Sequence, residues 1–257
     1  MSPETLRVEV DGPVATLTLA RAEKRNAVDA ETITGIGSFF ADPPEGVRAA
    51  VLQGEGDHFC AGLDLSQEVL RTPFGAMGHS RLWHRELEKV ESGGIPLVVA
   101  LHGAAIGGGM ELAVTGHVRV ADPTAFYSLP EGRRGIFVGG GGSVRIARLL
   151  GFDRMREMML TGRRIPADEG QRLGLSHELV AEGEAPARAI ELAREIAGNA
   201  PLANRMILTA LPRIADMSAT DGLWAESLAV GVSQTTADAA EGVSAFLEKR
   251  PPDFRGS

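Results

Sequence analysis

The chain has 257 residues, of which 44% are apolar and 23% charged, with 32 glycines, 14 prolines and one cysteine. This composition is typical of a globular protein that can bury a sizeable core, and it excludes a fibrous or largely disordered chain. The net charge of -8 argues against a surface built to bind nucleic acid or anionic membrane, and the apolar runs are too short to span a bilayer. With Cys60 as the lone cysteine and no leader pattern at the start, we expect a cytoplasmic protein.

The first 150 residues predict a mixed α/β body in which strand-strand-helix units recur. Apolar residues alternate with polar ones over 6–10, and Asp11-Gly12 supplies the turn into a second strand over 14–19. Asp29 is placed to cap a helix that ends before the breaker at 42–44. Further strands are predicted at 49–52, 97–101, 118–121 and 125–127, and helices within 65–90, 107–115 and 143–150.

After Gly151 the pattern is mainly helical. Helices are predicted at 155–160, 166–173, 186–196, 201–214, 220–230 and 237–247, with one extended stretch at 175–180. The proline-rich segment 249–254 is expected to wrap over a surface. We therefore predict a core over 1–200 and a C-terminal helical region over 201–257.

Several common chemistries lack their motifs. The glycine runs at 107–109 and 139–142 are not followed by the lysine of a phosphate-binding loop, and Val144 stands where a dinucleotide fingerprint needs its third glycine. No nucleophile elbow, zinc-protease helix or cysteine pair is present. Nucleotide hydrolysis, metal catalysis and serine-nucleophile mechanisms therefore lose most of their support.

The segment 103–113 carries the strongest signal for chemistry. It follows a strand and opens a helix with glycines, and free backbone N–H groups at such a start favour an anion or a developing oxyanion. Glu111 lies three residues after Gly108, so its carboxylate returns to nearly the same face as that amide. The alternative is a glycine-lined helix packed tightly on the sheet, with Glu111 as an ordinary first-turn acid.

Two more segments complete the pattern. One is the small-residue turn 59–65, and the other is 126–131, which ends in Glu131. Two carboxylates on separate elements suit acid-base catalysis, although Glu131 taken alone also fits a surface turn after Pro130. The motifs that carry a family resemblance are, in order, 21–27, 59–65, 103–113, 126–131, 139–143, 160–165, 167–170 and 245–250.

With these motifs in this order, the chain resembles the enoyl-CoA hydratase/isomerase superfamily, the crotonase-like proteins, almost from end to end. The resemblance implies an α/β fold, a crotonase-like spiral of ββα units followed by a C-terminal helical region that mediates trimerisation. A homotrimer or a dimer of trimers is expected. Acyl-CoA thioester is the implied ligand, with coenzyme A as part of the substrate and with no separate cofactor or metal.

The resemblance also implies roles at the matching positions. The backbone amides of Leu63 and Gly108 would form an oxyanion hole for the thioester carbonyl, and Glu111 and Glu131 match the two glutamates that add water across a 2,3 double bond. Enoyl-CoA hydratase is therefore the expected activity. An enoyl-CoA or dienoyl-CoA double-bond isomerase and a non-catalytic acyl-CoA-binding homologue remain the alternatives.

Binding residues follow in the same way. For the coenzyme A part of the substrate, the resemblance implies Lys24, Arg25, Ala27, Ala61 and Asp64, together with Phe246 and Lys249, which would reach the ligand of a neighbouring subunit. For the acyl pocket it indicates the stretch 65–86, with Phe74, Met77, Trp83 and His84.

One departure from the family pattern concerns the site. Arg133 and Arg134 directly follow Glu131-Gly132, where relatives usually carry at least one apolar residue. If a guanidinium lies beside Glu131, it favours the ionised carboxylate and handicaps it as a proton donor; the alternatives are that the arginines point away or that they contact a polar acyl group.

Overall fold

The computed structural model describes residues 4–67 and 72–257. Its main sheet has six strands in the order β1-β2-β3-β4-β6-β9, in which β1 and β2 are antiparallel and the other neighbours are parallel. The hairpin predicted at the N-terminus is confirmed, and Asp11 pairs with Val14 across its turn. The strands are β1 (Leu6–Asp11), β2 (Val14–Leu19), β3 (Ala49–Gly54), β4 (Leu97–Leu101), β6 (Val118–Ala121) and β9 (Glu178–Leu179).

A second, three-stranded sheet has the order β5-β7-β8, with β5 at Ala104–Ile106, β7 at Phe126–Ser128 and β8 at Ile165–Pro166. Sequence patterning predicts β7 but not β5 or β8, because two or three residues are too few to show an alternation. The predicted extended stretch 175–180 is wrong in length, since β9 covers two residues.

Single bridges extend the line of this second sheet. Cys60 pairs in parallel with Ala105, and Val28 pairs in parallel with Leu63. The extended segments around residues 28, 60–63 and 104–106 therefore lie side by side, although each belongs to a different ββα unit. The predicted spiral requires this stacking. This stacking brings the turn after Cys60 against the turn that follows β5.

Three helices cover one face of the main sheet: α1 (Ala30–Ala41), α2 (Pro73–Ser92) and α3 (Gly108–Ala113). Asp29 caps α1 as predicted, since its carboxylate accepts a hydrogen bond from the Thr32 N–H at 2.8 Å. Phe39 and Phe40 meet edge to face with ring centroids 5.2 Å apart and join the core between α1 and the sheet. Two short 3₁₀ helices, η1 (Ala22–Lys24) and η2 (Leu65–Gln67), precede α1 and α2.

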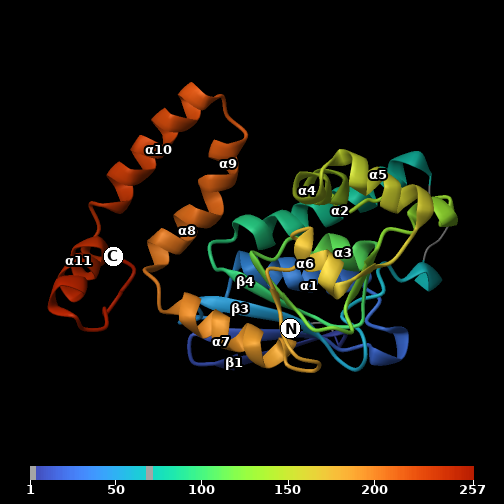
Figure 1. Ribbon diagram of the computed structural model, residues 1–257, viewed down its shortest axis with the longest axis horizontal. Coiled ribbons are helices and arrows are strands. Elements are labelled where there is room, and N and C mark those ends of the chain that lie inside the picture. The colour runs from blue at the N-terminus through green and yellow to red at the C-terminus, as the bar shows by residue number, and fades with distance from the viewer. Residues whose placement is uncertain (1–3, 68–71) are drawn as a thin grey trace.

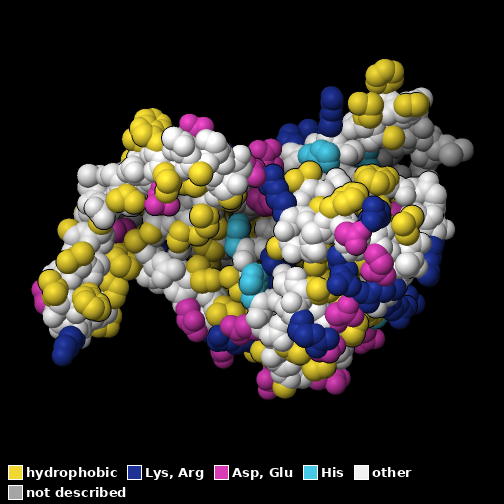
Figure 2. All heavy atoms as spheres, turned by 45° about the horizontal axis from the view of Figure 1, so that its top comes forward, with side chains coloured by type: hydrophobic (Ala, Val, Ile, Leu, Met, Phe, Trp, Pro, Cys, Tyr) yellow, Lys and Arg dark blue, Asp and Glu magenta, His cyan; other side chains and the backbone are white. Residues whose placement is uncertain are grey.

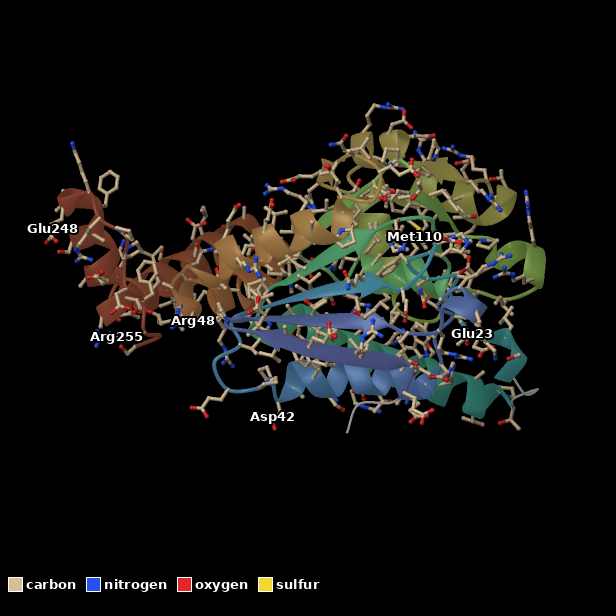
Figure 3. All side chains as sticks on the ribbon, turned by 90° about the horizontal axis from the view of Figure 1, so that it is seen from below. Glu23, Asp42, Arg48, Met110, Glu248 and Arg255 are labelled. Atoms are coloured by element: carbon tan, nitrogen blue, oxygen red, sulfur yellow. The ribbon has the colours of Figure 1, made fainter. Side chains whose placement is uncertain are left out.

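The opposite face of the sheet is covered by α7 (Ala185–Ala197), and Figure 3 shows α1 and α7 on the two sides of the strands. The buried side of α7 is a row of alanines spaced four residues apart, which is the spacing that keeps side chains on one helical face. They pack on small and β-branched residues of the strands. The alanines are Ala185, Ala189, Ala193 and Ala197.

The remaining core elements lie around α3. They are η3 (Glu131–Arg134), α4 (Gly142–Leu150), α5 (Phe152–Thr161) and α6 (Ala167–Arg172). The predicted helix at 143–150 is confirmed as α4, and Gly141 in front of it adopts φ +96°, a conformation that favours glycine.

The C-terminal helices extend away from the sheet as an arm (Figure 1). They are α8 (Pro201–Thr209), α9 (Leu211–Ala215), α10 (Ala219–Ser233) and α11 (Ala237–Glu248). The single helix predicted over 201–214 is wrong, because Pro212 has no N–H to continue the helical ladder and the chain divides at Ala210. The last residues fold back without helix as expected, and the Phe254 carbonyl accepts a hydrogen bond from Arg48 at 2.9 Å. None of the helices in 4–67 or 72–257 combines the length and the apolar character that a membrane crossing needs.

Candidate active site

The first component of the site is a pair of neighbouring backbone amides, those of Leu63 and Gly108. The parallel pairing of Cys60 with β5 sets Gly62 against the end of β5, where a Cβ on Gly62 would lie 2.7 Å from the Ile106 carbonyl oxygen and 3.4 Å from the Gly108 nitrogen. A Cβ on Gly108 would lie 3.3 Å from the Leu63 nitrogen. Among the described residues neither N–H donates a hydrogen bond, so both are available to one small acceptor.

Glu111 is the second component. It projects from α3, is 4% exposed, and its Oε1 accepts hydrogen bonds from the N–H groups of Gly140 at 2.8 Å and Gly142 at 2.7 Å. Glycine is required here by space, since a Cβ on Gly142 would lie 2.8 Å from the Glu111 Cγ. Burial raises the pKa of Glu111, and the backbone N–H groups of the glycine run act against that rise by stabilising the carboxylate.

Glu131 is the third component and has a different environment. It begins η3 after β7, is 5% exposed, and its Oε2 has no hydrogen-bond partner within the described part of the chain. Gly107, at φ +54°, leaves room for it, because a Cβ there would lie 2.7 Å from the Glu131 Oε1. Burial, reinforced by the charge of Glu111, raises the pKa of Glu131 to about 7. At neutral pH this side chain holds a proton about half of the time.

The two arginines after Glu131 do not keep it ionised. Arg133 is exposed and its guanidinium donates to the Thr161 carbonyl at the end of α5. The charge of Arg134 lowers the pKa of Glu131, but less than burial raises it. Arg134 thus acts on the pKa of Glu131 in the expected direction, but the effect of burial is larger, and Arg133, which bonds to Thr161, follows the alternative that an arginine of the pair points away.

These components border one cavity of about 670 Å³. Its walls are Leu63, Gly108, Glu111 and Glu131, with apolar residues from α2 and from the loop before α4. The predicted acyl-pocket residues Met77 and Trp83 lie in the wall, whereas Phe74, which is 85% exposed, and His84 lie outside it. Four more lining residues fall within the predicted stretch 65–86, namely Leu65, Ala76, His79 and Ser80, whereas the prediction omits Ile136, Phe137, Val138, Gly139 and Gly140.

Trp83 ties the acyl part of the cavity to the amide pair. A Cβ on Gly108 would lie 3.0 Å from the Trp83 Cη2, and a Cβ on Gly140 would lie 2.8 Å from its Cε3. The indole is therefore wedged between the two glycine runs that the sequence singles out. The three apolar residues 136–138, directly before the glycine run 139–142, form a part of the cavity wall separate from α2. They were the sequence signal by which this part of the wall could have been predicted.

The residues predicted for the coenzyme A end gather around η1 and the 60–64 turn. Lys24 pairs with Asp64 at 3.1 Å, and the Ala61 N–H donates to the Arg25 carbonyl at 2.9 Å. Arg25 and Asn26 both adopt left-handed backbone, at φ +53° and +55°, to make this turn, and Ala27 follows them.

Asp64 makes its hydrogen bonds to other residues of the protein. Its carboxylate accepts hydrogen bonds from Ser66, from Arg21 at 2.7 Å and from Lys24, and these contacts hold its pKa well below the ordinary value. Asp64 therefore braces the segment that carries the Leu63 amide. Arg21 was missed at the sequence level because its contact with Asp64 joins residues 43 positions apart, whereas the bond from Ser66 to Asp64 spans two positions and was a local signal that the prediction did not use.

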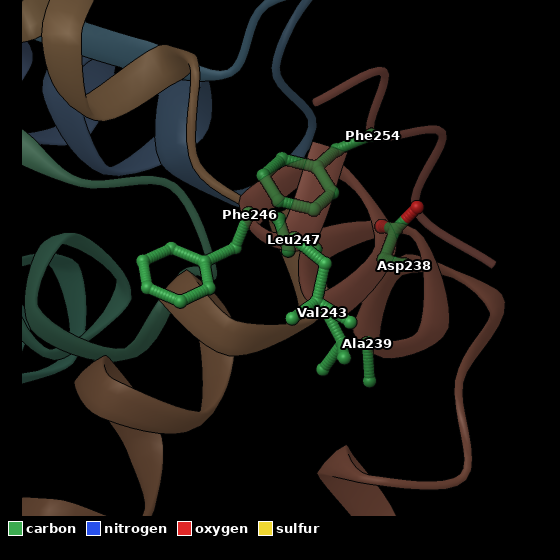
Figure 4. A pocket seen from close by; sticks show the side chains of 8 residues that line it. Asp238, Ala239, Val243, Phe246, Leu247 and Phe254 are labelled. Carbon is green, nitrogen blue, oxygen red and sulfur yellow. The ribbon is translucent and has the colours of Figure 1, made fainter. Parts of the chain in front are cut away.

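Phe246 and Lys249 lie far from the cavity of their own chain. Figure 3 places Glu248 and Arg255 at the opposite end of the molecule from Met110, the neighbour of Glu111 in sequence. Phe246 is 82% exposed at a shallow apolar groove of about 440 Å³ on α11 (Figure 4). Their predicted contact with the ligand of a neighbouring subunit stays a prediction.

The arm exposes many large apolar side chains, and hydrophobic side chains are visible over it in Figure 2. On its helices the exposed ones include Ile207, Leu211, Leu223, Trp224, Leu228, Val232, Val243, Phe246 and Leu247. Many large exposed apolar side chains on one part of a protein are typical of a protein contact region.

The fold places two buried carboxylates, those of Glu111 and Glu131, in the wall of one cavity beside the backbone amides of Leu63 and Gly108. Comparison with known proteins agrees: the family model described as enoyl-CoA hydratase/isomerase matches residues 9–257. A short-chain-enoyl-CoA hydratase of Clostridium acetobutylicum is 33% identical over 253 residues, covering 95% of this chain and 94% of its own.

Solved structures agree as well. A structure from Rhodopseudomonas palustris superposes with a TM-score of 0.93 at 47% identity, covering 95% of each chain. An enoyl-CoA hydratase from Bacillus anthracis gives a TM-score of 0.92 at 30% identity, covering 99% of this chain and 100% of its own. The chain belongs to the enoyl-CoA hydratase/isomerase family, and its fold is that of the crotonase-like proteins.

Proposed function

We propose that this protein is an enoyl-CoA hydratase, which adds water across the 2,3 double bond of an acyl-CoA thioester. The observation that carries the proposal is the pair of buried glutamates on one cavity wall, in unequal hydrogen-bond environments, next to two free backbone amides. Hydration needs a base and an acid together, whereas a proton shuttle within the substrate needs one such group.

The amides of Leu63 and Gly108 would hold the thioester oxygen. Attack at Cβ sends negative charge onto that oxygen as an enolate, and N–H groups already in place stabilise the charge where it develops. Removing one such donor typically costs about 10²–10³ in rate. Both donors are main-chain groups set by the stacking of two extended segments, so their position depends on the fold and not on a rotamer.

The unequal environments of the two glutamates support one assignment of the roles. Glu111, whose Oε1 accepts two N–H groups, is the carboxylate that removes a proton from water, and the resulting hydroxyl adds to Cβ. Glu131, with an unpartnered Oε2 and a pKa raised to about 7, gives its proton to Cα. The cycle ends with Glu111 protonated and Glu131 ionised, and transfer of one proton through solvent restores both.

The remaining binding roles extend the same proposal. Lys24 and Arg25 supply cations beside Ala27 and Ala61, where the phosphates and adenine of coenzyme A would lie. The exposed apolar surface of the arm supports assembly into the expected homotrimer or dimer of trimers.

The test is a screen of 2-enoyl-CoA thioesters of graded size in ¹⁸O-labelled water, following loss of the conjugated enoyl absorbance and the mass of the product. The wild type is expected to incorporate one ¹⁸O, and E111Q and E131Q are expected to lose turnover about 10²–10⁴-fold. E88Q, at an exposed glutamate on α2 outside the cavity, serves as the control.

Two results would overturn the proposal. Migration of the double bond without ¹⁸O would make the protein an isomerase. Binding of the thioesters without any turnover would make it a non-catalytic acyl-CoA-binding member of the family.

A further inference from the structure

Arg145 holds the loop that carries the hydrogen-bond donors of Glu111. It lies in the first turn of α4, its side chain is 16% exposed, and its Nη1 donates to the Gly140 carbonyl at 2.9 Å. The N–H of the same Gly140 donates to the Glu111 Oε1. One peptide unit away, Gly142 supplies the second donor. The guanidinium thus fixes the glycine run from the side opposite to the carboxylate.

A second contact anchors Arg145 itself. Its Nη2 forms an ion pair with Glu91 near the end of α2 at 2.6 Å. The Glu91 carbonyl in turn bonds to the ring of His117 at 3.1 Å, and the other ring nitrogen of that histidine accepts the Leu97 N–H of β4. A continuous set of polar contacts therefore runs from the main sheet through α2 and Arg145 to the glycine run.

We propose that Arg145 is a positioning residue for Glu111, which fixes Gly140 so that the carboxylate stays hydrogen-bonded and aimed into the cavity. The inference rests on the proposed hydratase function for its kinetic consequence. Its geometric part, the link from Glu91 through Arg145 to Gly140, does not. Without Arg145, the glycine run keeps the hydrogen bond that the Ser80 hydroxyl of α2 donates to the Gly139 carbonyl at 2.7 Å, but it loses the guanidinium contact at Gly140.

The charges around Glu111 set the expected pH behaviour. Glu131 faces it from η3, Arg145 lies behind the glycine run on α4, and His79 lines the same cavity from α2. The Arg145 charge lowers the pKa of Glu111 against the effect of burial. Loss of Arg145 removes both the charge and the ordering of the N–H donors, so Glu111 would become a carboxylate only at higher pH.

The experiment compares R145M and R145K with R148M in the purified full-length protein. Arg148 is on the same helix and forms an exposed ion pair with Asp216 at 3.0 Å, so R148M controls for loss of an arginine from α4. For R145M we expect kcat to fall about 10- to 100-fold with little change in KM, since a small misplacement of a catalytic group has that cost. The acidic limb of the kcat/KM profile should move to higher pH.

R145K keeps the charge without the two-armed contact, so it should recover part of the rate and most of the pH profile. E91Q, which frees Arg145 from α2, should act in the same direction as R145M but more weakly. An unchanged acidic limb in R145M, a loss confined to KM, or an equal effect of R148M would overturn the positioning role.

Titration of the Glu111 carboxyl by infrared difference spectroscopy, assigned with E111Q, separates this inference from the proposed function because it needs no substrate. If no enoyl-CoA is hydrated but the titration still moves upward in R145M, the function fails and the positioning role stands. If the wild type hydrates and R145M leaves both rate and titration unchanged, the positioning role alone fails.

Discussion

The burial of Glu131 should lower the stability of the folded protein at high pH, and this effect can be measured. Its pKa rises from an ordinary value of 4.5 to about 7 in the folded protein, with burial as the main cause. The folded state therefore binds more protons than the unfolded state between these two values, and stability falls as pH rises through that window. With one pKa unit worth about 1.4 kcal/mol, ionised Glu131 costs the fold about 3 kcal/mol above pH 7.

The perturbation is E131Q, which cannot ionise. The glutamine has its own packing cost, but that cost does not vary with pH, so the useful quantity is the difference in unfolding free energy between E131Q and wild type. Between about pH 5 and pH 8 this difference should move by about 2.5 kcal/mol in favour of E131Q. Over the same range the variant should keep its loss of turnover of about 10²–10⁴-fold.

Urea unfolding at matched ionic strength measures the difference in unfolding free energy between E131Q and wild type. The exposed variant E88Q, compared with wild type in the same way, is the control, and its difference should not vary with pH. In the wild type, kcat/KM should also fall about tenfold per pH unit above pH 7, since the proton donor is lost. A constant gap between E131Q and wild type from acid to base would refute the reasoning, because Glu131 would then be an ordinary ionised carboxylate and not the acid.

Three further changes test other parts of the structure. G108A places a Cβ 3.0 Å from Trp83 and 3.3 Å from the Leu63 nitrogen, so turnover should fall about 10²–10³-fold at near-normal thermal stability; unaltered kcat would argue against the amide pair. D64N removes the shorter of the two carboxylate contacts of the nearly buried Arg21, which keeps Asp29 at 3.5 Å, and should cost about 1.5–3 kcal/mol in urea unfolding; a loss below experimental error would contradict the bracing role. A193L overfills the contact of α7 with the sheet and should cost about 1–3 kcal/mol, whereas A187L on the exposed side of the helix should not; equal effects would show that α7 does not pack closely.

Local sequence rules predict most of the framework because those features depend on near neighbours. The hairpin turn at Asp11-Gly12, the cap at Asp29 and the glycine start of α3 are each decided within a few residues, and the structure has all three. The strands β5 and β8 escape such rules because they are too short to show a pattern and are extended through their partners. Pro212 indicated a break in the helix, and the prediction of one helix over 201–214 did not take it into account.

The candidate site divides in the same way. Glu111 was singled out by its place after the glycine start of a helix, and Glu131, which alone also fits a surface turn, by the order of the family motifs; both line the cavity. Their unequal environments could not be predicted, since the donors to Glu111 come from residues 29 and 31 positions away and the missing partner of Glu131 is a property of the packed cavity. The Arg145 contacts and the exclusion of Phe74 and His84 from the cavity likewise depend on how α2 lies against the loop before α4.

The donors at this centre all belong to peptide groups. In the proposed mechanism two N–H groups hold the thioester oxygen while two others hold Glu111, and three of the four belong to glycines, where a side chain has no room. The apolar lining beyond Trp83 is made of side chains that these peptide groups do not need. Evolution can therefore exchange the lining to accept new acyl groups while the reactive machinery is inherited unchanged with the backbone.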